Sequence, residues 1–446
     1  MHNRRIILWG AGQWSLEHYK EIYDNLRQDI CIVGIADNNY EKLNQKYTSV
    51  YDMYGFSLEY NTILSIENVK ELYDAEKIDS VFLGVYFDNY KEVKKQLDAI
   101  NIPLFSKFVS CPDMKENCTD EKIWNGIYVY VMKNIIAYHD FCASWRLVSW
   151  LCTDAGILID EMENYVHLHG KTPPWFLLSD FGRNVTEVDE CCVLSGKYCL
   201  NYWHFTYEIL PIIHLFEKNG YTGMYMLHYR EFSAELLNFY GINQERIIWV
   251  KDEEVPPVYR IRKMYCTEHL HSMFDNKNIG NITKLNVEVS DILIQKVCKG
   301  INLETYPKRI YVKRITNRKL VANEELLKKY GFVTIVPEEL TVEEQIRYFC
   351  AADIVLSPHG ANSSNALYMR KGKCFIETFP WNHITPCCNF LLKEKEVNYF
   401  MVVERFGRGG NVDIGPLNRN YGLTDIDLEL AILSAINTLE ARGEME

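Results

Sequence analysis

The sequence predicts an α/β protein in which buried parallel strands alternate with helices in two separate parts of the chain. Short apolar runs followed by polar turns and helical patterns occur within the first 100 residues and again beyond residue 300. The chain has 446 residues. That length is too great for one hydrophobic core, so we expect two or three domains.

Residues 1–115 are expected to form a Rossmann-like domain. Apolar and β-branched residues at 5–9, 30–36 and 80–86 predict three buried strands, with helical patterns between them. Strands and helices that alternate in this order form a parallel sheet with right-handed crossovers.

The turn after the first strand is a candidate second nucleotide site. Gly10-Ala11-Gly12 is similar to the start of a dinucleotide-binding loop, and Asp37 stands where the ribose-binding acid would be. Ser15 takes the place of the third glycine, so the fingerprint is incomplete. Two interpretations stay open: a nucleotide site formed by Gly10, Gly12 and Asp37, or a domain used for packing or sensing without a dinucleotide.

Two Tyr-x-x-x-Lys pairs lie in the same region. Tyr73 with Lys77 and Tyr90 with Lys94 have the spacing found in short-chain epimerases and dehydrogenases. Both occur around the third strand, which is too early for the catalytic pair of that family. This position argues against an active epimerase or dehydrogenase. An NAD(P)-dependent oxidoreductase or epimerase driven by this domain is kept as the alternative function.

Composition and charge restrict the partners. The formal net charge of −12 argues against nucleic acid, because phosphate backbones are bound by basic surfaces. The 14 cysteines include no C-x-x-C pair and are expected to be reduced thiols of a cytosolic protein. No residue spacing predicts a metal site.

The sequence also predicts a cytoplasmic location. The first apolar run stops at Gly10, which makes it too short for a signal peptide. The richest apolar stretch, residues 127–152, is interrupted by charged residues and is not expected to span a membrane. Peripheral membrane contact and the oligomeric state are left open.

Residues 116–300 are expected to form a middle domain with one informative helix. The apolar positions Trp203, Tyr207 and Leu210 recur at helical spacing, and Pro211 should kink the helix. His204 and Glu208 are four residues apart and so share one helix face. They are interpreted either as an acid/base pair or as an ordinary polar pair on a helix surface.

Residues 301–446 are predicted to form a second α/β domain that ends in a helix. Strands are expected at 309–312, 333–336, 354–356 and 375–376. Asn323 is expected to cap one helix, and Thr341 a second one through a capping box with Glu344. After the third strand, residues 357–362 form a turn that leads into another helix through Met369.

That turn is a candidate anion site. It lies at the carboxyl end of a parallel strand, where open α/β sheets bind their ligands. Gly360 and Ala361 leave the backbone exposed at the start of a helix, whose N–H groups favour anions. His359 adds a donor, while Arg314 and Arg318 follow another strand end and can bind phosphate in a bidentate manner.

Several motifs in the same order resemble glycosyltransferase family 61, also known as DUF563 or the capsular polysaccharide type. The resemblance spans roughly residues 195–405 and rests on Asn201-x-x-His204-x-x-x-Glu208, Tyr311-Val312-Lys313-Arg314, Arg318, Asn323-Glu324, Gly331-Phe332, Pro337-Glu338, Glu344-Gln345, Ala352-Asp353 and Pro358-His359-Gly360-Ala361.

This resemblance implies a GT-B fold with two facing Rossmann-like domains, at residues 116–300 and 301–446. The additional N-terminal domain precedes them in the chain. It implies an inverting glycosyltransferase that needs no metal or other cofactor and uses a nucleoside diphosphate sugar, most often UDP-linked. The expected acceptor is a glycan or lipid-linked oligosaccharide of polysaccharide biosynthesis. A non-catalytic nucleotide-sugar binding module is a further alternative.

The resemblance also assigns roles to residues. Diphosphate and sugar would be held by Arg314, His359, Gly360, Ala361, Asn362 and Asn365. Glu344 and Glu377 are candidates for nucleoside or ribose hydroxyls, and His204 and Glu208 would face them from the acceptor side. The sequence departs from the family pattern at Lys313 and at Asn362-Ser363-Ser364, where the family has serine and Gly-Leu-Thr.

Overall fold

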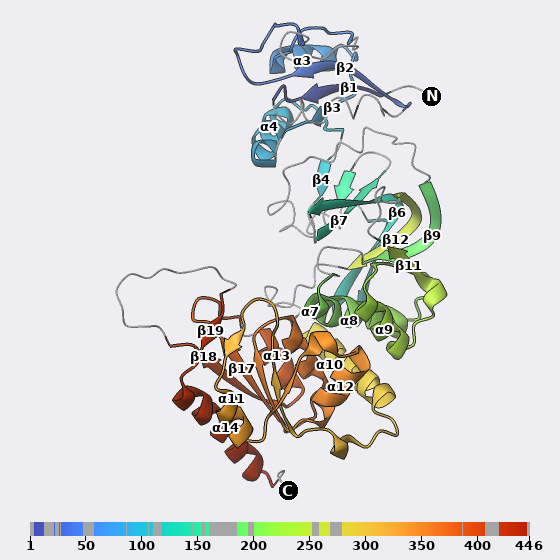
Figure 1. Ribbon diagram of the computed structural model, residues 1–446. Helices are drawn as coiled ribbons and strands as arrows, with labels where there is room; N and C mark the ends of the chain where they lie inside the picture. Colours follow the sequence, from blue (N-terminus) through green and yellow to red (C-terminus); the bar gives the residue numbers. More distant parts are fainter. Residues whose placement is uncertain are drawn as a thin grey trace. The chain divides into compact units, whose positions relative to one another are not determined.

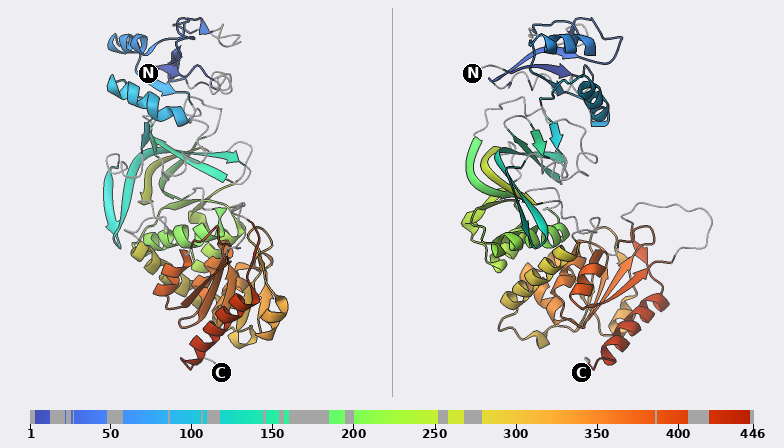
Figure 2. Two further views of the ribbon diagram at one scale, coloured as in Figure 1. Left: turned by 90° about the vertical axis from the view of Figure 1, so that its left-hand side faces the viewer. Right: turned by 180° about the vertical axis from the view of Figure 1, so that it is seen from behind.

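The computed structural model describes residues 4–12, 22, 26, 28–47, 58–85, 87–105, 107–109, 118–143, 146–153, 157–159, 185–194, 200–251, 258–267, 279–385, 387–405 and 419–443. The chain forms two compact units, each made of several segments (Figures 1 and 2). The first unit contains Met1–Glu121, Tyr130–Cys191 and Asp252–His269. The second contains Lys122–Val129, Cys192–Lys251 and Leu270–Glu446. The expected boundaries at residues 115 and 300 stay predictions.

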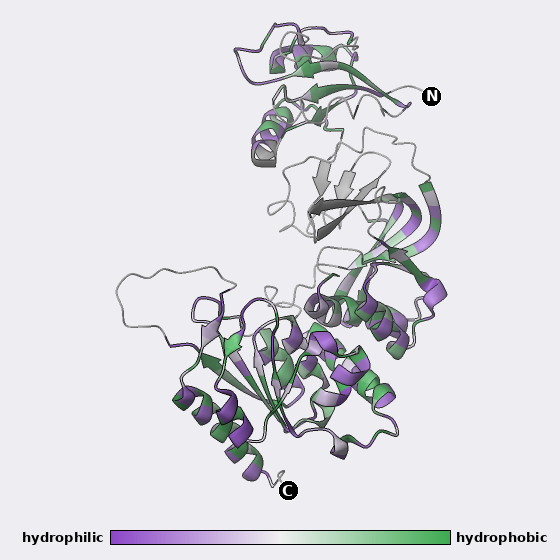
Figure 3. Cartoon of the chain, viewed as in Figure 1, coloured by the Kyte–Doolittle hydropathy of each residue, from purple (hydrophilic) through white to green (hydrophobic). Residues whose placement is uncertain are grey.

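The first unit begins with a small parallel sheet. Its strand order is β2-β1-β3, with β1 at Arg4–Trp9, β2 at Ile30–Ala36 and β3 at Ser80–Leu83. The helices α3 and α4 span Ile66–Asp74 and Phe87–Ala99. The apolar strands form the core of this part, and Figure 3 shows β1 and β2 in the green of hydrophobic residues. The three predicted strands are therefore present and parallel.

A nine-stranded sheet, most of whose strands belong to the first unit, was not predicted. Its strands follow one another in the order β9-β12-β6-β7-β8-β4, and β5 pairs with β6. Their bounds are Lys107–Val109 (β4), Asp120–Trp124 (β5), Ile127–Ala143 (β6), Arg146–Thr153 (β7), Ile157–Ile159 (β8), Val185–Val193 (β9) and Val258–Thr267 (β12). The apolar stretch at 127–152 is thus mostly an antiparallel hairpin of β6 and β7.

The second unit contains a five-stranded sheet in the order β15-β13-β16-β17-β18, in which every pair is parallel. The strands are Arg309–Val312 (β13), Val333–Ile335 (β15), Ile354–Pro358 (β16), Cys374–Phe379 (β17) and Asn398–Val403 (β18). β10 and β11, at Met224–His228 and Ile247–Val250, pair in parallel and continue the nine-stranded sheet beyond β9. β14 and β19, at Leu320–Val321 and Tyr421–Gly422, form a separate parallel pair.

Helices cover both faces of this sheet (Figure 1). On one face, buried residues of α11 and α14 form a core cluster with alternate residues of β13, β16 and β17. The other helices and helical turns of the unit are α7 (Tyr202–His204), η4 (Phe205–Ile209), α8 (Leu210–Lys218), α9 (Glu231–Tyr240), η5 (Gln244–Arg246), α10 (Ile279–Val297), η6 (Leu303–Thr305), η7 (Pro337–Glu339), α12 (Val342–Ala351), η8 (Ala361–Tyr368) and α13 (Cys387–Glu394). The two in the cluster span Glu324–Lys329 (α11) and Asp425–Glu440 (α14). The sheet is therefore the middle layer of an α/β sandwich.

The predicted helix caps of the second unit are present. Asn323 accepts from the backbone N–H groups of the first turn of α11. Thr341 and Glu344 form a reciprocal capping box at the start of α12. These local sequence rules held because each cap satisfies backbone donors that a helix leaves unpaired.

The helix through His204 and Glu208 differs from the expected one. α7 passes into the π-helical turn η4 and then into α8, so Pro211 sits in the first turn of α8. Proline has no N–H for the preceding turn. The side-chain amide of Asn286 instead donates to the carbonyl of Tyr207 at 3.0 Å. The π-helical turn thus interrupts the α-helical hydrogen-bonding pattern here. Asn286 on α10 donates to a carbonyl oxygen to which Pro211 cannot donate.

No helix among the described residues combines the length and the apolar composition that a membrane crossing requires.

Candidate functional site

The carboxyl ends of three adjacent parallel strands form one edge of the five-stranded sheet. β13 leads into Arg314, β16 into His359 and Gly360, and β17 into the segment with His383. In an open α/β sheet this edge is where ligands bind. The structure thus brings together residues that are about 70 positions apart in the chain.

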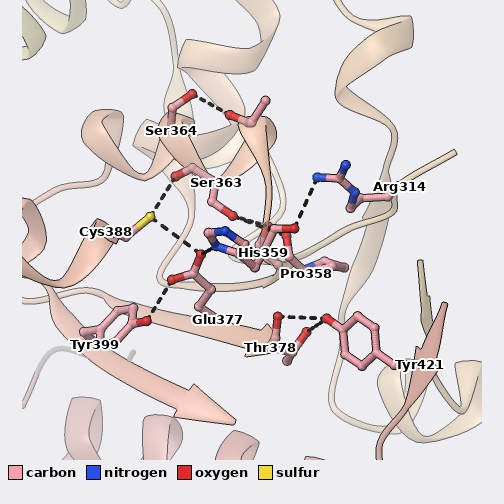
Figure 4. A network of polar contacts seen from close by, with 12 residues as sticks. Arg314, Pro358, His359, Ser363, Ser364, Glu377, Thr378, Cys388, Tyr399 and Tyr421 are labelled. Atoms are coloured by element: carbon pink, nitrogen blue, oxygen red, sulfur yellow. Dashed lines mark hydrogen bonds and ion pairs between the residues drawn. The ribbon is translucent and has the colours of Figure 1, made fainter. Parts of the chain in front are cut away.

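The guanidinium of Arg314 lies against the turn after β16 (Figure 4). Its NH1 donates to the carbonyl oxygen of His359 at 3.3 Å, and its Nε donates to the carbonyl of Asn317 at 2.8 Å. A Cβ atom on Gly360 would lie 1.4 Å from Arg314 NH1. Position 360 is therefore a glycine because the arginine occupies the space of a side chain.

Positive charges crowd around this turn. Burial lowers the pKa of Arg314, and the nearby charge of Arg318 lowers it further. Burial also lowers the pKa of Arg318, which has a left-handed backbone conformation with φ 57°. His383 has a lowered pKa because it is partly buried and close to Arg318 and His359. Cations that depress one another's protonation form a site that gains from binding an anion.

The helix that follows the turn is a 3-10 helix rather than the expected helix through Met369. η8 begins at Ala361 with Gly360 as its N-cap and ends at Tyr368. The first N–H groups of a helix have no intrahelical acceptor and point along its axis away from the helix. Backbone donors of residues 360–362 therefore add to the positive potential at the turn.

A fully buried carboxylate holds the ring of His359. Glu377, on β17, has no exposed surface, and its Oε1 lies 2.7 Å from His359 Nδ1. Tyr399 donates to Glu377 Oε2 at 2.8 Å, and the Cys388 thiol lies 3.7 Å from Oε1 (Figure 4). The ring of Phe379 stacks on the imidazole with centroids 4.9 Å apart. Glu377, predicted to meet nucleoside hydroxyls, instead contacts His359.

Asn365 also differs from its predicted role. It is completely buried, donates to Gln345 at 2.7 Å and accepts from the hydroxyl of Tyr202 at 2.8 Å. Its amide is thus occupied by α12 and α7 and is not exposed to a ligand. Ser363 and Ser364, which replace residues of the family pattern, are fully buried as well. That departure therefore alters packing inside η8 rather than an exposed ligand surface.

Among the acidic residues predicted to bind the donor, Glu344 caps the start of its own helix, α12. Its Oε2 accepts from the N–H of Thr341 at 2.9 Å as part of the capping box. A carboxylate that was not predicted, Glu338 on η7, lies nearer the turn. Its Oε1 accepts from Asn362 Nδ2 at 3.0 Å, and its charge acts on Arg314. Glu338 is exposed.

His204 and Glu208 form a close pair on the π-helical turn. His204 Nδ1 lies 3.0 Å from Glu208 Oε2, and the side chains are only 16% and 9% exposed. An ordinary surface pair would be far more exposed. Tyr207 lies between these two residues in the sequence. Burial raises the pKa of its hydroxyl, and the nearby Cys388 and Glu377 raise it further. The pair therefore belongs to a helix that contacts the elements of the His359 site.

The glycine turn of the N-terminal sheet has its own internal contacts. Asp37 Oδ2 accepts from the N–H of Ala11 at 2.5 Å, and Lys42 Nζ donates to the carbonyl of Ala11 at 2.5 Å. Gly10 has φ 120°, and a Cβ there would lie 2.4 Å from the carbonyl oxygen of Gly84. A Cβ on Gly12 would meet no atom within 4 Å. The helix expected here and Ser15 lie outside the described residues, and the second nucleotide site stays a prediction.

Sequence reasoning missed Glu338, His383 and Tyr399. The first two follow the carboxyl ends of β15 and β17, so polar residues just after each predicted strand were the available signal. Tyr399 lies within β18, which was not predicted. The side chain of Tyr90 lies outside the described residues. Among the described ones, no group of three metal-ligating side chains is arranged to hold a metal ion.

One family model matches part of the chain. Residues 202–376 match the family model described as glycosyltransferase 61, a segment that contains His204, Glu208, Arg314 and the turn after β16. The match covers less than half of the chain. It supports glycosyltransferase family 61 for this segment, and with it a role in glycosyl transfer.

No curated protein matches the chain. Among solved structures, similarity is found to a metal-soaked Flv1 flavodiiron core from Synechocystis, with 10% identity, coverage of 85% of each chain and a TM-score of 0.21. A flavo di-iron protein mutant from Thermotoga maritima has 12% identity, coverage of 84% of this chain and 83% of its own, and a TM-score of 0.20. Scores this low do not indicate a shared fold.

Proposed function

We propose that this protein is an inverting, metal-independent glycosyltransferase of the GT-B type. It transfers a sugar from a nucleoside diphosphate sugar, UDP-linked in our expectation, to a hydroxyl group of a glycan or lipid-linked oligosaccharide. The observation that supports this most directly is the contact of Arg314 with the Gly360 turn, beside Arg318 and the imidazole of His383.

The leaving group explains why such a site would be needed. When the sugar departs, negative charge grows on the diphosphate, and donors fixed in advance stabilise that charge. Arg314 is held by two backbone carbonyls, so its guanidinium does not have to reorganise during the reaction. The N–H groups at the start of η8 and the imidazole of His359 are the other donors of this site.

The acceptor hydroxyl must lose a proton as it attacks the anomeric carbon. We assign this base role to Glu208, with His204 beside it at 3.0 Å. Both side chains are shielded from bulk water, which would otherwise compete with the acceptor hydroxyl for the base. The variants Glu208→Gln and His204→Gln decide which of the two side chains takes the proton.

The hydroxyl-binding role first considered for Glu344 and Glu377 belongs, in this proposal, to Glu338. It is exposed and keeps one carboxylate oxygen beyond the bond to Asn362. Glu377 instead positions His359, and Asn365 holds α7, α12 and η8 together. A cytoplasmic location with peripheral membrane contact would suit a lipid-linked acceptor and is part of the same proposal.

A donor screen tests the function. The purified protein is mixed with a panel of nucleotide sugars, and binding is read as thermal stabilisation and then as hydrolysis of the sugar. Arg314→Ala should lower turnover on the order of 100-fold or more while the fold survives. The control is Arg405→Ala, which removes an exposed arginine of the same unit that pairs with Asp427. Full turnover by Arg314→Ala would contradict the diphosphate assignment.

Glu208→Gln separates the two candidate bases. The change removes proton acceptance but keeps the size of the side chain, so turnover should fall at least 100-fold with little change in donor affinity. His204→Gln should have the smaller effect on turnover if Glu208 is the base. The reverse order would assign the proton to His204, and a large loss of donor affinity would remove Glu208 from the base role.

A further inference from the structure

Glu377 receives three donors from three different elements. They are His359 Nδ1 after β16 at 2.7 Å, the Tyr399 hydroxyl of β18 at 2.8 Å and the Cys388 thiol of α13 at 3.7 Å. The carboxylate itself has no exposed surface. A buried carboxylate with this many donors is stabilised as an acceptor and not as a proton donor.

This arrangement decides which nitrogen of His359 bears the fixed proton. Burial and the neighbouring carboxylate raise the pKa of the Tyr399 hydroxyl, so Tyr399 stays protonated and donates. The same holds for Cys388, whose pKa is raised by burial, by Cys387 and by Glu377. An acceptor carboxylate has no hydrogen to give, so the hydrogen of the 2.7 Å contact belongs to Nδ1 of His359.

The ring has little freedom to turn away. Phe379 stacks on one face at a centroid distance of 4.9 Å and an angle of 24°, and His383 lies 5.5 Å away at a tilt. The backbone of the same residue is held too, since its N–H donates to Thr378 at 2.9 Å and its carbonyl accepts from Arg314. Both the side chain and the main chain of His359 are therefore positioned (Figure 4).

A purely structural role would explain this network poorly. Replacing a buried charged pair by apolar side chains of similar size is often neutral or stabilising, so packing alone gives no reason to keep it. The network instead surrounds the imidazole of His359, at the turn where Arg314 and the start of η8 collect positive charge.

We infer that Glu377, supported by Tyr399, is a positioning residue that fixes His359 with hydrogen on Nδ1 and leaves Nε2 as the atom that donates to the diphosphate of the donor. The inference rests on the proposed function for the identity of the ligand. It adds that the ionised carboxylate favours the doubly protonated ring when an anion is bound. Glu377 thereby acts through His359 and does not touch the substrate.

Nitrogen NMR of histidine-labelled protein tests the inference directly, with UDP as the probe. The His359 signals are identified by their loss in His359→Asn. In the wild type, Nδ1 should bear hydrogen with and without UDP, and added UDP should shift Nε2 toward the protonated value. Glu377→Gln should lose the single tautomer, weaken UDP binding roughly tenfold or more and move the pH at which UDP binding weakens to a lower value.

Tyr399→Phe is the second variant, in case Glu377→Gln does not fold. It should change the His359 tautomer, the UDP affinity and the pH dependence of UDP binding in the same direction as Glu377→Gln, but by smaller amounts. Its matched control is Tyr330→Phe, which removes a tyrosine–carboxylate bond of 2.6 Å to Glu429 elsewhere in the unit and should leave His359 unchanged. Unchanged His359 signals and UDP affinity in Glu377→Gln, or in Tyr399→Phe where Glu377→Gln is unfolded, would overturn the inference. A wild type that binds neither UDP nor any nucleotide sugar would refute the proposed function instead.

Discussion

At the scale of single residues, Gly360 depends on Arg314. A methyl group at position 360 would overlap the guanidinium, 1.4 Å from NH1, so Gly360→Ala should displace Arg314 from the turn. We therefore expect Gly360→Ala to weaken UDP binding about as much as Arg314→Ala does. Residues in direct contact give non-additive effects. The double variant should consequently bind UDP nearly as well as either single variant, as calorimetry can measure; fully additive losses would show that the two residues act separately.

His383 gives the site a pH dependence. Burial and the charges of Arg318 and His359 hold its pKa below the ordinary value, so the imidazole is largely neutral near pH 7. A bound diphosphate adds negative charge, which raises that pKa and makes binding take up protons. UDP affinity should therefore increase as the pH falls from 8 toward 6.5.

Calorimetry in buffers of different ionisation enthalpy measures this proton uptake. The control is His383→Asn, which should show less uptake while the titration of UDP itself is unchanged. For the free protein the sign is opposite, because a histidine with a lowered pKa takes up its proton more readily when unfolded. Its contribution to stability is fully present above the unfolded pKa and is lost as the pH falls from there through the folded pKa. Equal proton uptake by the two proteins would place His383 away from the bound anion.

At the scale of elements, the π-helical turn η4 depends on Asn286. This residue of α10 is 2% exposed and donates to the carbonyls of Tyr207 and Ile282, both at 3.0 Å. Asn286→Leu should lower the free energy of unfolding by about 1–3 kcal/mol, because a buried carbonyl loses its donor. Pro211→Ala restores a backbone N–H in α8 and should recover part of this loss in the Asn286→Leu background.

Thermal or urea unfolding of the four proteins measures this coupling. In the wild-type background Pro211→Ala has no unserved carbonyl to repair, so it should bring little gain. If Pro211→Ala changed the free energy of unfolding by the same amount in both backgrounds, the hypothesis that Asn286 replaces the backbone donor missing at Pro211 would be wrong.

The elements also show what could be predicted from sequence. The strands β1, β2, β13 and β16 and the caps at Asn323 and Thr341 follow from local apolar runs and local hydrogen bonds, and they were predicted. The antiparallel pairing of β6 with β7 was not, because no Asn-Gly or Gly-Gly signal lies between the two strands in the sequence.

The same limit applies to the site. Arg314 and the Gly360 turn were found because each directly follows a strand of the predicted parallel sheet. The burial of Asn365 and Glu377 could not be predicted, since it depends on how α7, α12 and β18 pack around them. A polar residue in a motif is as readily a support of the site as a contact to the ligand, and only the packing distinguishes the two.

At the scale of the whole molecule, the two candidate nucleotide sites lie in different compact units. The Gly10 turn belongs to the first unit and the Gly360 turn to the second, although the chain passes between the units several times. The formal net charge is −12, so an anionic ligand gains nothing from the overall charge and must be bound by local donors. Arg314 and Arg318 supply such donors at the second site.

Hydrogen exchange of the full chain, with UDP or NADH added, separates the two sites. A ligand that binds only the folded state stabilises what it contacts, by about 2.7 kcal/mol at 100 times its Kd. UDP should therefore slow exchange at residues 314–318 and 360–362 and leave the Gly10 turn unchanged, because Asp37 there is already bonded to the N–H of Ala11. NADH should slow exchange at neither place. Protection of the Gly10 turn by NADH, with none at residues 360–362 by UDP, would favour the oxidoreductase alternative over glycosyl transfer.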